Sequence, residues 1–77
     1  MGAQAEVDYV IHFQGHIFPI EVKSGTTGRL RSLKIFMEEK KSKIGIRISA
    51  QTLSFHENIL SLPLYMIHEL PRILRQL

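Results

Sequence analysis

The sequence predicts an α/β (α+β) fold, in which one small mixed β-sheet and its helices follow the order ββαβ(β)α. Three observations lead to this class. β-Branched and aromatic residues alternate on both sides of Gln14-Gly15, apolar residues recur at helical spacing over residues 30–37, and isoleucines alternate again over residues 44–48.

The first two strands are expected at residues 6–13 and 16–23, joined by Gln14-Gly15 as a two-residue turn. If these two residues form the whole loop, the numbers of every cross-strand pair sum to twenty-nine. Pro19 has no N–H to donate to a ladder, so its part of the second strand should lie at a sheet edge or a bulge.

Residues 24–28 are expected to form a loop, with Thr26 or Thr27 as a cap for the helix that follows. That amphipathic helix should cover residues 28–41, and residues 44–48 should form a buried strand. Residues 52–62 predict one or two short strands broken around residues 56–58. The tail from residue 64 should be mostly helical, and Pro71 should divide it or begin a second helix.

With 77 residues, the chain is expected to be a single domain with a small core. Apolar residues make up 44% and charged residues 22% of the chain, which is typical of a globular protein. The absence of cysteine excludes disulfides and cysteine-based zinc sites. No stretch resembles a signal peptide or a membrane span, so no membrane partner and a cytoplasmic location are expected.

The formal net charge is only +3, but the basic residues are clustered between residues 29 and 43. Arg29, Arg31 and Lys34 lie near the start of the expected helix, where they could contact phosphates of DNA or another nucleic acid. The alternative is a solvated helix face with charge pairs four residues apart. Further lysines follow at positions 40, 41 and 43.

The strongest chemical signal is Asp8 on the first strand and the Glu21-Val22-Lys23 triplet on the second. Alternation puts Glu21 and Lys23 on one face, and the hairpin register puts Asp8 opposite Glu21. Two adjacent carboxylates require a cation between them, which Lys23 or a divalent metal could supply. Oxygen ligands suit Mg²⁺ or Mn²⁺, and such an ion can activate water for attack on a phosphodiester.

The spacing of Asp8 and Glu21-Val22-Lys23 resembles the signature of PD-(D/E)xK (restriction-endonuclease-like) nucleases. The strings at residues 5–11, 19–25 and 32–36, with Leu62-Pro63-Leu64-Tyr65, are similar to the C-terminal domain of unassigned function in bacterial and archaeal AAA+-like ATPases. This resemblance covers residues 6–67 and implies a restriction-endonuclease-like core. It also implies that the chain is a fragment of a larger ATPase-associated protein.

Residue by residue, the resemblance implies that Asp8, Glu21 and Lys23 are catalytic and that Asp8, Glu21 and the Val22 carbonyl bind the metal. Two features depart from the superfamily. Val7 stands where a proline often precedes the aspartate, and the helix before the first strand, which often supplies another acid, is absent. Because this helix is missing, the truncated form is expected to be inactive as an endonuclease, with a metal-dependent endonuclease as the alternative.

Several alternatives remain open from the sequence. Glu6 shares the expected face of Asp8 and could replace the absent acid or could be an exposed strand-end residue. His12 lies on the same side, whereas the other histidines show no metal-ligand spacing. The second function class is a non-catalytic interaction or regulatory domain of an ATPase. Without the upstream helix, apolar residues of the first strand should be exposed, predicting a homo-oligomer or pairing with the missing segment.

Overall fold

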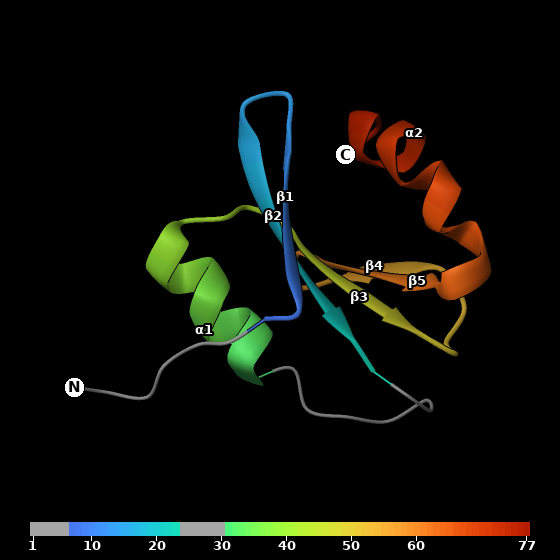
Figure 1. The fold of residues 1–77 in the computed structure, drawn as a ribbon, viewed down its shortest axis with the longest axis horizontal. Helices are drawn as coiled ribbons and strands as arrows, with labels where there is room; N and C mark the ends of the chain where they lie inside the picture. Colours follow the sequence, from blue (N-terminus) through green and yellow to red (C-terminus); the bar gives the residue numbers. More distant parts are fainter. Residues whose placement is uncertain (1–6, 24–30) are drawn as a thin grey trace.

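The computed structural model describes residues 7–23 and 31–77 and confirms the mixed α+β class (Figure 1). The expected loop at residues 24–28, with its capping threonines, lies outside the described residues. The described elements, in chain order, are β1 (Tyr9–Phe13), β2 (His16–Val22), α1 (Arg31–Lys40), β3 (Gly45–Ser49), β4 (Ser54–His56), β5 (Ile59–Pro63), the 3₁₀ helix η1 (Leu64–Glu69) and α2 (Leu70–Arg75).

The five described strands form one sheet in the order β1-β2-β3-β5-β4. The three inner strands, β2, β3 and β5, are parallel, and the edge strands β1 and β4 pair antiparallel with their neighbours. Because the inner strands are parallel, their carboxyl ends lie at the same end of the sheet. Ligands of open α/β sheets commonly bind at such an end.

The β1–β2 hairpin has the predicted register. Gln14 and Gly15 both have positive φ, at 53° and 79°, as a type I′ turn requires. Phe13 pairs with His16 and Tyr9 with Ile20, so the predicted sum of twenty-nine holds for all five ladder pairs. The turn dipeptide therefore fixes which side chains of the two strands lie next to each other.

Pro19 lies where it was expected, although β2 as a whole is an inner strand between β1 and β3. The pairing with β3 begins at Ile20, which lies beside Ile46, one residue after Pro19. The residue without an N–H therefore stands just before the parallel ladder begins. On the side of β3, the part of β2 that contains Pro19 is therefore an edge, as predicted.

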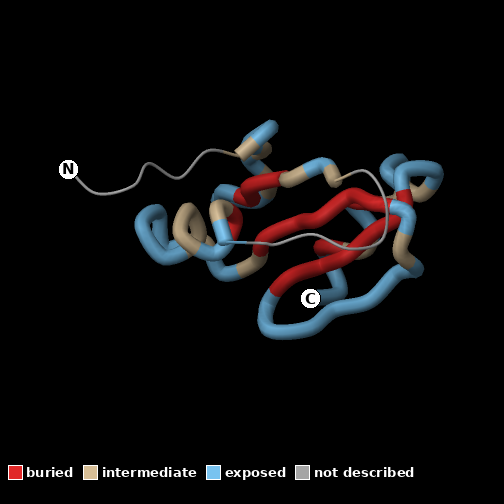
Figure 2. The backbone as a smooth tube through the Cα atoms, turned by 90° about the horizontal axis from the view of Figure 1, so that it is seen from below, coloured by how far each residue is buried: buried red, intermediate tan, exposed pale blue. Residues whose placement is uncertain are grey.

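The larger core lies on the sheet face that η1 and α2 cover, opposite the face that carries α1 (Figure 1). Side chains from every inner strand meet the α2 leucines there, and the buried segments run through the middle of the molecule (Figure 2). Burying such a side chain fully contributes about 1.5–3 kcal/mol. The cluster comprises Phe18, Ile20, Ile46, Ile48, Leu60, Leu62, Leu70 and Leu74.

Helix α1 covers the opposite face through a single fully buried residue, Leu33. The helix approaches β3 closely at Gly45, where an added Cβ would lie 2.5 Å from Met37 Sδ and 3.1 Å from Leu33 Cγ. Glycine is thus needed at position 45 because it lacks a Cβ and lets α1 lie close to β3, and not because of its backbone conformation. The helix is 10 residues long, from Arg31 to Lys40, within the predicted range.

The C-terminus of α1 closes with an αL residue that is not glycine. The Ser42 N–H donates to the Met37 carbonyl at 2.9 Å, and the Lys41 N–H donates to the Glu38 carbonyl at 3.4 Å. This is the Schellman pattern, in which the first of the two donor residues, here Lys41, is usually glycine. Here Lys41 has φ 56°, a conformation that is unfavourable for a residue with a side chain.

The C-terminal half follows the predicted order. A two-residue turn at Glu57 and Asn58 separates β4 from β5, within the region where a break was expected. The tail divides as predicted, with Pro71 in the first turn of α2. The part before it is a 3₁₀ helix, residues 64–69, whose side chains include no buried residue.

Candidate metal centre

Asp8 directly precedes β1 and is bound to β2 by its side chain. Its Oδ2 accepts a hydrogen bond from the Val22 N–H at 2.8 Å. Its own N–H donates to the Ile20 carbonyl at 3.0 Å. The carboxylate therefore takes the place that a backbone carbonyl would have if β1 continued alongside β2.

This arrangement corrects the expected pairing of Asp8 with Glu21. The described ladder ends at Tyr9 and Ile20, and the Asp8 N–H bonds to the residue before its expected partner. The strand end is shifted by one residue, so the two carboxylates are not a ladder pair. Asp8 instead reaches β2 through the Val22 N–H, next to Glu21 in the chain.

The backbone of Val22 adds a second oxygen at this edge. In a β-strand, the N–H and C=O of one residue point toward the same neighbouring strand. Since the Val22 N–H reaches Asp8, the Val22 carbonyl also faces the side of β1, beyond the point where the β1 ladder ends. A carboxylate and a carbonyl thus converge on one edge of β2.

Glu21 and Lys23 lie on one face, as predicted, and form an ion pair of 3.1 Å between Lys23 Nζ and Glu21 Oε2. Their side chains are 12% (Glu21) and 32% (Lys23) exposed. The other oxygen, Glu21 Oε1, is buried and has no hydrogen-bond partner among the described residues. A buried carboxylate oxygen without a partner is costly, and this is where a bound cation would compensate.

Sequence reasoning missed the polar neighbours of Glu21 on the sheet. Arg47 lies beside Glu21 in the ladder, and Ser61 lies beside Arg47 on β5. Arg47 is only 6% exposed, between Ile46 and Ile48. The alternation of an arginine with buried isoleucines was visible in the sequence, but its position next to Glu21 required the β2–β3 register.

The residues present fit a hard divalent cation. The available donors are the Asp8 carboxylate, the Glu21 carboxylate and the Val22 carbonyl, all of which are oxygens. Mg²⁺ and Mn²⁺ prefer such ligands and usually retain several waters. Over residues 7–23 and 31–77, no group of three or more His, Asp or Glu side chains lies within metal-binding range, and Glu6 is outside that part.

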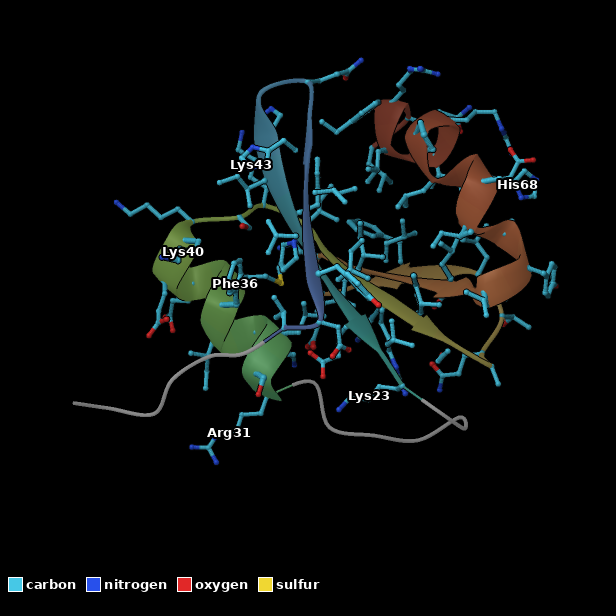
Figure 3. All side chains as sticks on the ribbon, viewed as in Figure 1. Lys23, Arg31, Phe36, Lys40, Lys43 and His68 are labelled. Carbon is cyan, nitrogen blue, oxygen red and sulfur yellow. The ribbon has the colours of Figure 1, made fainter. Side chains whose placement is uncertain are left out.

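The predicted nucleic-acid residues divide between two ends of the molecule. Arg29 lies outside the described residues. Arg31 begins α1 at the end of the sheet where Lys23 lies, whereas Lys40 and Lys43 lie at the opposite end (Figure 3). Lys34 is exposed and bonds Glu57 at 3.3 Å.

Of Val7, Tyr9 and Ile11, the apolar residues expected to be exposed without the upstream helix, only Tyr9 is exposed. Tyr9 is 63% and Val10 43% exposed, while Val7 and Ile11 are half-buried. His12 is also exposed. Self-association over this edge stays a prediction. Sedimentation equilibrium at micromolar concentration should show a dimer, and a monomer alone would refute it.

Comparison with known proteins supports a family but no activity. The profile of one family, described as a domain of unknown function (DUF4143), matches residues 1–67. The chain belongs to the DUF4143 family. Neither a search of curated proteins nor one of solved structures gave a match. Within residues 7–23 and 31–77, no helix is long and apolar enough to cross a membrane.

Proposed function

We propose that this DUF4143 domain is a nuclease-like domain that binds DNA or another nucleic acid and hydrolyses phosphodiesters with Mg²⁺ or Mn²⁺. The observation that supports the proposal is the edge of β2. There Asp8 is bound to Val22, and Glu21 carries a buried oxygen without a partner. A cytoplasmic location is part of the proposal.

Three groups would hold the ion: the second oxygen of Asp8, Glu21 Oε1 and the Val22 carbonyl. Bound there, the ion would supply Lewis acidity and a more acidic water. The protein's own contribution is positioning. The Val22 N–H fixes the Asp8 carboxylate through Oδ2, and no described residue bonds the other oxygen.

Lys23 would supply a positive charge and hydrogen-bond donors to the substrate at this site. Its ammonium lies 3.1 Å from Glu21 and is about one third exposed, so it can also reach a phosphate oxygen or a water from solvent. A cation next to a reacting phosphate stabilises developing negative charge. Glu21 holds this ammonium close to the β2 edge.

The test is a Mn²⁺ titration by calorimetry on the parent and on Asp8→Asn. The amide oxygen of asparagine can still accept from the Val22 N–H, so the fold is kept while the negative charge is lost. We expect micromolar to low-millimolar binding in the parent and at least a tenfold loss in Asp8→Asn, by analogy with other ligand losses. Equal Mn²⁺ binding by both proteins would refute the proposed centre.

Cleavage of labelled DNA with Mg²⁺ or Mn²⁺ tests the chemistry separately. Activity should disappear in Asp8→Asn and in Lys23→Met, while Arg72→Gln, which removes a positive charge from α2 outside the candidate site, should retain it. Metal binding without any cleavage by the parent would reject hydrolysis and leave a nucleic-acid-binding domain.

The second candidate function is a catalytically inactive interaction or regulatory domain of an AAA+-like ATPase. The observation that favours it is that Asp8 and Lys23 already have protein partners, Val22 N–H and Glu21. In that case the cluster is structural. Asp8→Ala should then lower the melting temperature and change no chemistry, and the parent should bind no Mn²⁺.

A further inference from the structure

We propose that a second surface, formed by His16, Lys40, Lys41 and Lys43, contacts the nucleic-acid backbone at a distance from the candidate metal centre. We name it the hairpin-end basic surface. The assignment of nucleic acid as the ligand of this surface rests on the proposed function. Its residues come from the start of β2 and from the end of α1 with the segment that follows it, so two separate parts of the chain build it.

The surface is concave and free of acidic lining residues. Two adjoining hollows, of about 170 Å³ and about 290 Å³, share His16 and Lys43 in their walls. Lys40 and Lys41 line the smaller hollow, and Arg75 lines the larger. No described aspartate or glutamate side chain contributes to either wall, although Glu38 and Glu39 are nearby in α1. The three lysines form no ion pair with a described acid.

The backbone at Lys41 is a second, independent observation. This residue has φ 56° at the position where a helix of this kind usually ends with glycine. Glycine or asparagine there would remove the strain, yet a lysine that lines the smaller hollow is present. Strain of this type accompanies functional residues, because the surrounding structure maintains it for another purpose.

Ser42 adds a hydroxyl to the same wall. Its Oγ is buried and has no hydrogen-bond partner among the described residues. After rotation about its Cα–Cβ bond, it could donate to a phosphate oxygen in the hollow. The ammonium groups and the hydroxyl form a donor-rich surface that matches an anionic backbone.

The position of the surface suggests how a nucleic acid would reach both sites. Ile17, in the wall of the smaller hollow, lies on the same face of β2 as Glu21 and Lys23 because residues alternate along the strand. From His16 to Lys23 the strand spans roughly 23 Å at about 3.3 Å per residue. That distance corresponds to about seven base pairs of B-form DNA at about 3.4 Å each.

The experiment measures binding of the complete chain to a labelled DNA duplex of about sixteen base pairs, which spans both sites. Binding is measured at several salt concentrations without metal. Lys41→Gly, Lys43→Gln and their combination are compared with Arg72→Gln, which removes the same charge from α2. Each single lysine variant should reduce the slope of log K against log salt by about 0.9 and their combination by about 1.8, and Arg72→Gln should not change it.

Lys41→Gly has a second readout that separates function from folding. It should raise the melting temperature, because glycine adopts the αL conformation freely, and it should still weaken DNA binding. Slopes that are unchanged in both lysine variants would overturn the proposal. Equal affinity for a polyglutamate chain of the same charge would overturn the assignment to nucleic acid.

The two proposals fail in different measurements. If Asp8→Asn abolishes Mn²⁺ binding but the lysine variants bind DNA like the parent, only the hairpin-end basic surface is rejected. If the lysine variants lose DNA affinity but the parent binds no Mn²⁺, the surface stands and the metal centre is rejected. If the parent cleaves DNA, a duplex that extends less than about seven base pairs beyond the cut cannot reach the hairpin-end basic surface. Such a duplex should be cleaved with a raised KM.

Discussion

Replacing Glu21 with methionine should make the metal-free domain more stable. Methionine has a similar length, is flexible and places no polar atom in the partly buried site. The side chain is 12% exposed, and its Oε1 is buried without a hydrogen-bond partner among the described residues. Removing such an oxygen is expected to stabilise the fold by about 1–3 kcal/mol.

The loss of the ion pair with Lys23 acts against this gain. Lys23 is 32% exposed, and pairs with that much solvent contribute about 0–1 kcal/mol. The net expectation is therefore a gain of about 1 kcal/mol, which corresponds to a rise of about 4–8 °C in the melting temperature of a domain this small. Calorimetry or circular dichroism in the presence of a chelator measures it.

Saturating Mn²⁺ should reverse the comparison. At about ten times its dissociation constant, a metal that binds only the folded state stabilises the parent by about 1.4 kcal/mol, and the variant should gain nothing. Glu38→Met, at an exposed position of α1, is the control and should change neither quantity appreciably. A metal-free Glu21→Met protein that is less stable than the parent would refute the reasoning, since Glu21 would then support the fold itself.

Three further outcomes are expected. Gly45→Ala should destabilise the domain by about 1–3 kcal/mol because its Cβ would lie 2.5 Å from Met37 Sδ. The cost measured by urea unfolding should be smaller in a Met37→Ala background. Glu57→Asn should stabilise the β4–β5 turn by up to about 1 kcal/mol, because Glu57 has φ 53° and asparagine tolerates this region; an unchanged urea midpoint would contradict it. The hydrogen bond and charge of Arg72 lower the pKa of Glu69, so Glu69 stabilises the fold above its ordinary pKa, and this stabilisation is lost as the pH falls through the lowered value. The melting-temperature difference between the parent and Glu69→Gln should accordingly be positive near neutrality and shrink in acid.

The local parts of the fold were readable from the sequence. Gln14-Gly15 fixes the type I′ turn and with it the register of five pairs, because the turn type determines which residues face each other. The period of Leu33 and its neighbours gives α1, and Pro71 marks the start of α2. Each of these depends on interactions within a few residues.

The non-local parts were not readable. The placement of Arg47 beside Glu21 depends on how far α1 carries the chain before β3 begins, and no short pattern encodes that distance. The strand-end shift at Asp8 depends on the carboxylate bonding the Val22 N–H instead of continuing the ladder. For this reason the sequence placed Asp8 and Glu21 on neighbouring strands but paired them directly, which the structure does not.

The outer position of β1 has a practical consequence for spectroscopy. The chain has no tryptophan and two tyrosines, and both are largely exposed, Tyr9 at 63% and Tyr65 at 78%. Intrinsic emission of this protein therefore reports on its surface and changes little when the core unfolds. Tyr9 directly follows Asp8, so a paramagnetic ion bound there should quench Tyr9 and leave the Tyr65 signal, and Tyr9→Phe would assign the quenched component.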